Sequence, residues 1–153
     1  MFEYPGSARP ESSAFLSRLH DEEVAEVLEN TQARRYLEGE LAVIEGGTDN
    51  ALFLIHTGSF EVILSSEQGP VRVGTLRRGD IFGELSFFDG APRSADVRAL
   101  EDSEALILTQ AGFDRLRLSN SRLAFMVLMD LARVLSERFR ALDRRLVEGS
   151  RHR

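Results

Sequence analysis

The sequence predicts a mainly β domain with flanking helices (α+β). It has the pattern of a jelly-roll-like β-barrel with N-terminal helices, a short helix in one late loop and a long C-terminal helix. The chain has 153 residues, which suits one domain with its own core. Over about residues 36–109 the apolar residues follow a period of two, broken by frequent Gly or Asn turns. On both sides of this region the period is helical.

The N-terminal part divides into an arm and helical sequence. Residues 1–13 contain Pro5, Gly6 and Pro10, which predict a flexible arm before a domain that spans residues 14–148. An apolar cluster at residues 15–19 predicts a first helical segment. Asp21 is the candidate N-cap of a second segment, which carries apolar residues at helical spacing.

The barrel is expected to consist of short strands joined by turns such as EGGTDN, HTGS and RRGD. Short strands at this spacing are typical of barrels and jelly rolls. The predicted strand cores are residues 41–44, 52–56, 60–64, 72–76, 95–99 and 105–109.

Helical spacing returns after residue 109. A short helix is predicted around Phe113, Leu116 and Leu118, and Asn120 or Ser121 is the candidate N-cap of a long helix over about residues 121–147. Its apolar stripe comprises Leu128, Leu131, Leu135, Phe139, Leu142 and Leu146. We expect the first half of this stripe to pack on the barrel and the second half to be covered by a homodimer partner or another protein. Residues 149–153 are predicted to form a tail.

The composition excludes several chemistries. There is no Cys, and all 19 basic residues are Arg, so thiol and lysine-dependent mechanisms are excluded. His20, His56 and His152 are scattered, which disfavours a metal-dependent cupin-like enzyme. We therefore expect no metal ion and no cofactor in this protein.

The charge is distributed unevenly. Residues 1–109 contain 9 Arg and 20 Asp or Glu, whereas residues 110–153 contain 10 Arg and 5 Asp or Glu. The acidic body argues against a nucleic-acid partner. No signal peptide or membrane-spanning run is evident, so we expect a cytoplasmic protein without membrane contact.

Charged residues occur within the otherwise apolar stretch FGELSFFDGAPRSADVRAL, residues 82–100. Gly83 lets a ligand approach the backbone closely. Glu84 accepts hydrogen bonds and would repel a phosphate, so it suits a hydroxyl donor. A helical turn at residues 85–88 would direct free amide groups at an anion.

The second part of the stretch supplies donors. Arg93 offers a fork of donors that matches phosphate oxygens, and Ser94 adds a hydroxyl and a backbone amide beside it. An acceptor for a sugar hydroxyl and donors for a phosphate together suit a ribose phosphate.

The order FGELSFFDGAPRSADVRA resembles the phosphate-binding cassette of the cyclic nucleotide-binding domain family. The turn residues Gly39, Gly46, Gly58 and Gly79 also fall where that family places its glycines. The resemblance covers roughly residues 15–146. A lone Phe-Gly-Glu or a lone Pro-Arg would be a weak signal, whereas the whole cassette is specific.

The resemblance implies that Glu84 accepts from the ribose 2'-OH and that Arg93 pairs with the cyclic phosphate. Gly83, Leu85, Ser94 and Ala95 would complete the pocket. Family members usually cap the base with the C-terminal helix. Here the nearest positions are Arg138, which could reach a base acceptor, and Phe139, which could stack on the base.

Three hypotheses follow. The favoured one is a stand-alone sensor of cAMP, with cGMP as runner-up, that signals through its C-terminal helix and carries no output domain. It would be a binding module and not an enzyme. The second is a protein of the same fold that binds no nucleotide and acts as a scaffold, or as a regulatory subunit that binds a partner through its basic helix. Glu84 and Arg93 would then form a structural ion pair. The third is the cupin-like enzyme, which the histidines disfavour.

Overall fold

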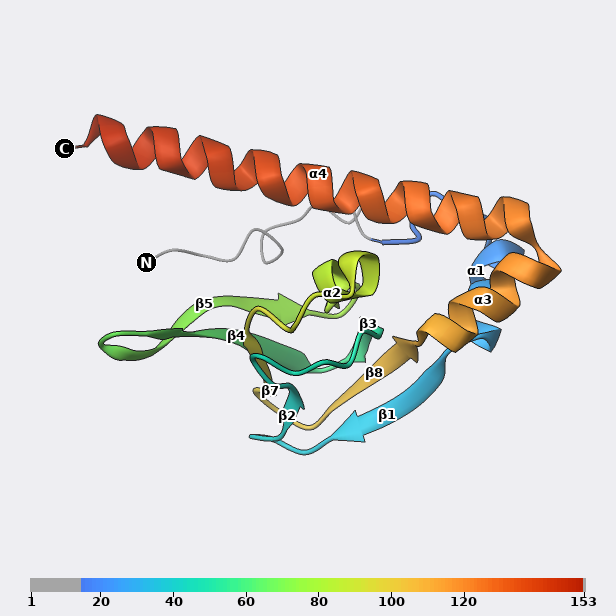
Figure 1. Ribbon diagram of the computed structural model, residues 1–153, viewed down its shortest axis with the longest axis horizontal. Coiled ribbons are helices and arrows are strands. Elements are labelled where there is room, and N and C mark those ends of the chain that lie inside the picture. Colours follow the sequence, from blue (N-terminus) through green and yellow to red (C-terminus); the bar gives the residue numbers. More distant parts are fainter. Residues whose placement is uncertain (1–14, 153) are drawn as a thin grey trace.

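The computed structural model describes residues 15–152. The predicted arm at residues 1–13 lies outside the described residues. The chain forms two four-stranded antiparallel sheets with helices at one end and a long C-terminal helix across the top (Figure 1). The predicted fold class is confirmed, although the strands form two facing sheets and not one closed barrel.

Along the chain, one helix is followed by six strands, a short helix, two strands and two helices. The helices are α1 (Asp21–Glu29), α2 (Glu84–Asp89), α3 (Gln110–Ser119) and α4 (Ser121–Arg151). The strands are β1 (Gln32–Tyr36), β2 (Leu41–Val43), β3 (Leu52–Thr57), β4 (Ser59–Ser66), β5 (Gly69–Arg77), β6 (Ile81–Phe82), β7 (Asp96–Ala99) and β8 (Ser103–Leu108). One sheet has the order β1-β8-β3-β6 and the other β2-β7-β4-β5.

Strand β1 was not among the predicted strands. It pairs with β8 in the register Gln32↔Ile107, but all of its residues except Tyr36 are exposed. A strand with four exposed residues lacks the alternation that predicts a half-buried strand. Its edge position follows from pairing with β8 alone.

The helix predicted at residues 15–19 is wrong. These residues form turns, and Leu16 has a φ of 67°, in the left-handed region. The amide of Leu16 donates to Asp130 Oδ2 on α4 at 2.6 Å, and the buried side chain of Leu16 packs in the core. The N-cap of α1 is His20 and not Asp21, because the His20 amide donates to Glu23 Oε1 at 3.0 Å.

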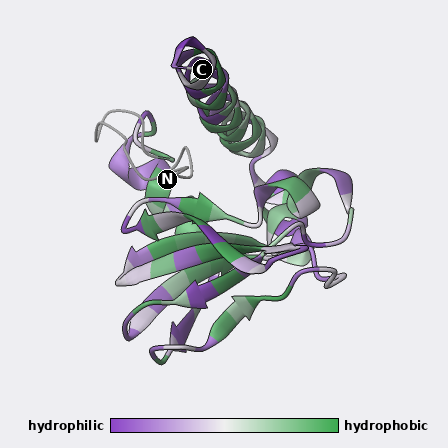
Figure 2. Ribbon diagram, turned by 90° about the vertical axis from the view of Figure 1, so that its left-hand side faces the viewer, coloured by the Kyte–Doolittle hydropathy of each residue, from purple (hydrophilic) through white to green (hydrophobic). Residues whose placement is uncertain are grey.

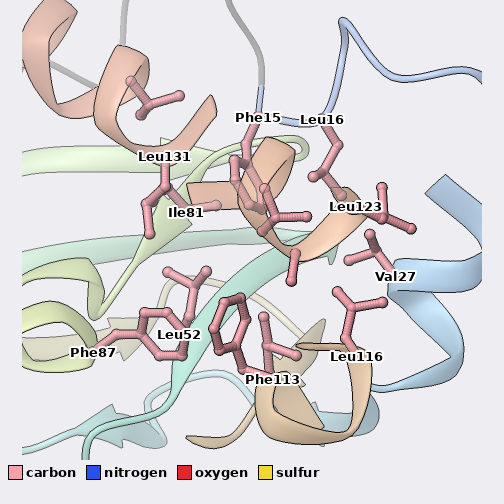
Figure 3. Packing of buried hydrophobic residues seen from close by; sticks show 14 residues of the cluster. Phe15, Leu16, Val27, Leu52, Ile81, Phe87, Phe113, Leu116, Leu123 and Leu131 are labelled. Carbon is pink, nitrogen blue, oxygen red and sulfur yellow. The ribbon is translucent and has the colours of Figure 1, made fainter. Parts of the chain in front are cut away.

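The buried apolar residues form two clusters. One fills the space between the sheets; it includes Tyr36, Phe53, Phe60 and Phe82, and Figure 2 shows hydrophobic and hydrophilic segments interspersed along the strands around it. The other joins the helices to β3, β6 and β8 (Figure 3). Its labelled members are Phe15, Leu16, Val27, Leu52, Ile81, Phe87, Phe113, Leu116, Leu123 and Leu131. Leu118, predicted to fill α3, is exposed instead.

Helix α4 begins after Asn120, whose Oδ1 accepts from the amide of Leu123 at 3.1 Å. Its buried face does not follow the predicted stripe, of which only Leu131 is fully buried. The buried residues of α4 are Leu123, Ala124, Val127, Asp130, Leu131, Val134 and Arg138. No residue of α4 after Arg138 is buried, so the core anchors only the N-terminal half of this helix. No helix in the described part of the chain is long and apolar enough to span a membrane.

Candidate functional site

The site is built on the loop that follows β6. Gly83 has a φ of 79° and forms the N-cap of α2, and Gly90, with a φ of 66°, ends that helix. A Cβ at Gly83 would lie 2.7 Å from Arg93 Nη1 and 2.8 Å from the Ala51 carbonyl oxygen. Both the backbone conformation and the lack of space therefore require glycine here.

The segment between α2 and β7, which we call the return of the loop, holds Arg93 opposite α2. The amide of Gly46 donates to the carbonyl of Arg93, and the amide of Arg93 donates to the carbonyl of Gly47, both at 2.8 Å. This pair of backbone bonds joins the turn after β2 to the end of the loop. The Arg93 side chain is consequently directed back towards Gly83.

Helix α2, the return of the loop, one sheet and α4 enclose a cleft with a volume of about 740 Å³. All eight residues that the sequence singled out line this cleft: Gly83, Glu84, Leu85, Arg93, Ser94, Ala95, Arg138 and Phe139. The structure thus brings together residues from two regions of the chain that lie more than forty positions apart. Their role in binding stays a prediction.

Arg93 is only 3% exposed and is held on several sides. Its Nη2 donates to Asp49 Oδ2 at 2.7 Å and to the Ala51 carbonyl at 2.8 Å, and its Nη1 donates to the Gly83 carbonyl at 2.9 Å. Asp49, by contrast, has a side chain that is 56% exposed. Sequence reasoning missed Asp49, because it read EGGTDN as a turn.

A structural ion pair between Glu84 and Arg93 was one prediction, but Glu84 pairs with a different residue. Its Oε1 accepts from Arg138 Nη1 at 2.7 Å, and both residues are only 5% exposed. Arg138 Nη2 donates to the Ile81 carbonyl at 2.6 Å. These two bonds direct the guanidinium group of Arg138 towards Glu84 and the end of β6, and its contact with a base stays a prediction.

The rest of the cleft is largely hydrocarbon. Its sheet side is lined by Val43, Val62, Leu64, Val73, Phe82 and Val97, and its α4 side by Leu135, Ser136, Phe139 and Leu142. Phe139 lines the cleft although its side chain is 69% exposed. A concave apolar site with charged groups at one end suits a small ligand that has an anionic end and a flat apolar end.

Metal chemistry finds no support in the geometry. Within residues 15–152, no group of three or more His, Asp or Glu side chains is placed to hold a metal ion. The charged residues of the cleft, Glu84, Arg93 and Arg138, are suited to hydrogen bonding with a ligand.

Residues 33–120 match the family model of the cyclic nucleotide-binding domain, which is more than half of the chain. The chain belongs to this family. The match includes Asp49, Glu84 and Arg93 and ends at the start of α4. The match does not extend to Arg138 and Phe139, which the three-dimensional structure places on the cleft.

Curated relatives include the cAMP-dependent protein kinase regulatory subunit of Aspergillus fumigatus, which is 36% identical over 106 residues. This alignment covers 69% of the present chain and 25% of the regulatory subunit. The cyclic AMP receptor protein of Thermus thermophilus is 32% identical over 126 residues, which cover 82% of the chain and 56% of that protein. The chain thus spans about a quarter of the fungal subunit and about half of the bacterial receptor.

Solved structures resemble this cyclic nucleotide-binding domain over most of its length. A cyclic nucleotide-binding domain from Methylobacillus flagellatus has a TM-score of 0.79 at 30% identity. The superposition covers 85% of this chain and 74% of the Methylobacillus chain. The catabolite activator protein of Thermus thermophilus has a TM-score of 0.78 at 31% identity, with 89% and 62% covered.

Proposed function

We propose that this domain binds a 3',5'-cyclic nucleotide, with cAMP as the favoured ligand, and acts as a sensor. The observation that carries the proposal is the placement of Glu84 and Arg93, a buried acid and a buried base, on one apolar cleft. Burying charges is costly, so such a pair at a concave surface suggests a binding role. The names of the fungal and bacterial relatives, which refer to cAMP, support the choice of ligand.

Arg93 and Glu84 each have a hydrogen-bond partner in the protein, and in this proposal the ligand shares or replaces that partner. The cyclic phosphate takes donors of Arg93 that Asp49 now occupies, and the ribose 2'-OH donates to Glu84 beside Arg138. Ser94 and the backbone around Gly83, Leu85 and Ala95 complete the phosphate and sugar contacts.

Movement of α4 is the proposed output. A ligand shifts a helix only if it contacts the helix more favourably in one state than in the other. Helix α4 supplies Arg138, Leu135, Phe139 and Leu142 to the cleft, and its part beyond Arg138 contributes nothing to the buried core. Binding in the cleft can therefore bias the position of the C-terminal half of α4.

The partner that we propose for α4 is a second copy of this chain. Apolar residues on α4 recur at alternating spacings of three and four: Phe125, Leu128, Ala132, Leu135, Phe139, Leu142 and Leu146. This is the heptad spacing by which two helices form a coiled coil. Phe125, Phe139 and Leu146 are exposed in the single chain, so pairing would cover them. Leu135, Phe139 and Leu142 also line the cleft, which links ligand binding to association.

Calorimetric titration of the purified chain with cAMP and 5'-AMP tests the proposal. We expect cAMP to bind and 5'-AMP to bind much more weakly, because Glu84 tolerates a dianion poorly. Arg93→Ala should weaken cAMP binding by roughly 10- to 150-fold, since charge-assisted hydrogen bonds contribute about 1.5–3 kcal/mol. Arg115→Ala, which removes an exposed Arg of α3 outside the cleft, is the control. Equal affinity for both nucleotides, or none for cAMP, would contradict the proposal.

One observation favours a second function. Arg93 and Glu84 already have ion-pair partners, Asp49 and Arg138, so the site is electrostatically balanced as it stands. A domain of this kind could act as a nucleotide-independent interaction module through α4. Self-association without any nucleotide binding in the same titration would support that function.

A further inference from the structure

The polar side chains around the cleft fall into two groups. Glu84, Arg93 and Arg138 carry charges and lie at one end, where each has an ion-pair partner. The other hydrogen-bonding side chains among the described lining residues are the hydroxyls of Ser86, Ser94 and Ser136. A hydroxyl both donates and accepts, and it rotates to suit its partner.

Adenine and guanine differ in the direction of the hydrogen bonds that they require. Adenine presents an exocyclic amino donor where guanine presents a carbonyl acceptor, and guanine carries a second amino group. Side chains with a fixed pattern of donors and acceptors, such as Asn, Gln or a free Arg, distinguish the two bases. Among the described residues, no Asn, Gln or further charged side chain lines the apolar end of this cleft.

The apolar walls hold a base without reading its edge. Val62, Leu64 and Val73 line the sheet side, and Leu135 and Leu142 line the α4 side. Phe139 lies on the same side with much of its ring exposed to solvent. Stacking on an aromatic ring tolerates different bases, because every base has a π face.

We infer that this cleft holds the base by stacking and apolar contact and does not read its hydrogen-bonding edge. The affinities for cAMP and cGMP then differ by less than about tenfold, because walls of hydrocarbon discriminate far less than paired polar groups do. Phe139 strengthens the binding of both nucleotides equally. The inference rests on the proposed function, since it assigns a selectivity to that same cleft.

Calorimetric titrations of the full chain with cAMP and with cGMP test the inference. We expect dissociation constants within about tenfold of each other. Phe139→Ala should weaken both nucleotides by roughly 5- to 150-fold and leave their ratio unchanged. Ser136→Ala should also leave the ratio unchanged, because the hydroxyl serves either base.

Met129→Ala is the matched control. Met129 is an exposed apolar residue of α4 that lies neither on the heptad stripe nor on the cleft. We expect it to leave both affinities unchanged. Phe125→Ala reports the contribution of helix association, because Phe125 lies on the stripe but outside the cleft. An equal loss in the Phe125 and Phe139 variants would assign the effect to helix association and overturn the stacking role.

Two further results would overturn base tolerance: a preference above about 100-fold for either nucleotide, or a Phe139→Ala or Ser136→Ala variant that changes the ratio. These results leave the proposed sensor function intact, since a nucleotide still binds. Failure of both nucleotides to bind would instead contradict the sensor function itself, and the inference with it.

Discussion

Asp49 and Arg93 form an asymmetric ion pair: the guanidinium group is buried, whereas the carboxylate is more than half exposed. A second anion that approaches Arg93 must share it with Asp49 or displace it. Asp49 therefore stabilises the ligand-free site and opposes anion binding in the proposed function. The same side chain has opposite effects on stability and on affinity.

Asp49→Asn should bind cAMP more tightly and lower the stability of the ligand-free domain. The partly exposed pair is worth about 0.5–1 kcal/mol, which corresponds to a roughly two- to fivefold gain in affinity. Calorimetry and denaturant unfolding measure the two effects. Glu29→Gln changes the net charge equally at an exposed position on α1 and should change neither. Weaker cAMP binding by Asp49→Asn would contradict this assignment.

Glu61 on β4 shows how a buried charge is held away from the cleft. Its carboxylate is buried, and it accepts from Arg98 Nε at 2.8 Å and from Arg72 Nε at 2.6 Å. Burial by itself would raise the pKa of Glu61, but the hydrogen bonds and charges of Arg98 and Arg72 outweigh it, so its pKa is lowered. The pair of arginines thus stabilises the folded state as long as Glu61 is ionised.

Glu61→Gln should destabilise the domain by about 1–3 kcal/mol at pH 7, because it removes the charge-assisted hydrogen bonds that the half-exposed Arg72 and Arg98 donate to a buried carboxylate. A lowered folded-state pKa means that this stabilisation is present above the unfolded value near 4.5 and is lost as the pH falls below it. Denaturant unfolding of both proteins between pH 7 and pH 3 should therefore show a difference that shrinks in acid. Glu104→Gln, whose partner Arg35 is exposed, should cost less than about 1 kcal/mol. A difference that is constant with pH would be inconsistent with this account.

At the scale of elements, α4 has two halves with different partners. Up to Arg138 it packs on the core, and the hydrogen bond from Leu16 to Asp130 also ties it to the start of the described chain. Beyond Arg138 it extends to Arg151 without a buried residue, and Figure 1 shows it running past the β4 and β5 strands. The second half is therefore the part that a ligand or a second chain can stabilise.

The double variant Phe125→Glu/Leu146→Glu should abolish self-association. Both residues lie on the heptad stripe and outside the cleft, so two charges per helix would repel across a coiled coil while the binding residues stay unchanged. Sedimentation velocity with and without cAMP provides the measurement. Leu118→Glu introduces the same charge at an exposed Leu of α3 and should behave like the unmodified chain. An unchanged association state in the double variant would refute pairing through α4.

At the scale of the whole molecule, the cleft lies between the strands β2, β4, β5 and β7 and the helix α4. The sheets enclose one apolar cluster, and the helices with β3, β6 and β8 enclose the other. Glu84 follows the strand β6, whereas its partner Arg138 belongs to α4. A ligand that contacts both sides of the cleft should stabilise the complete domain.

Saturation with cAMP should raise the thermal midpoint of the domain. A ligand at about 100 times its dissociation constant stabilises the folded state by about 2.7 kcal/mol. For a domain of this size this corresponds to a shift of roughly 5–10 °C. The chain contains no Trp whose fluorescence could report unfolding, so circular dichroism is the suitable measurement. The Arg93→Ala variant should show little shift, and an equal shift in that variant would contradict binding at Arg93.

The elements with a regular pattern were predictable from the sequence. The period of two in the middle of the chain predicted most of the strands, and Asn120 marked the start of α4 correctly. The loop of Gly83, Glu84, Arg93 and Ser94 was recognisable because its residues lie close together in the chain. Strand β1 was missed because four of its five residues are exposed, so its sequence lacks the alternation of apolar and polar residues that marks a half-buried strand.

Only the tertiary structure decided which groups surround the buried charges. Glu84 meets Arg138 from 54 residues away, and Arg93 meets Asp49 from 44 residues away. Neither pair has a local signature, because a hydrogen bond between distant residues depends on the paths of both segments through the fold. The face that α4 buries was likewise decided by packing: helical spacing showed that the helix has apolar residues, but the shape of the neighbouring sheet and helices selected Val127, Leu131 and Val134 to face the core.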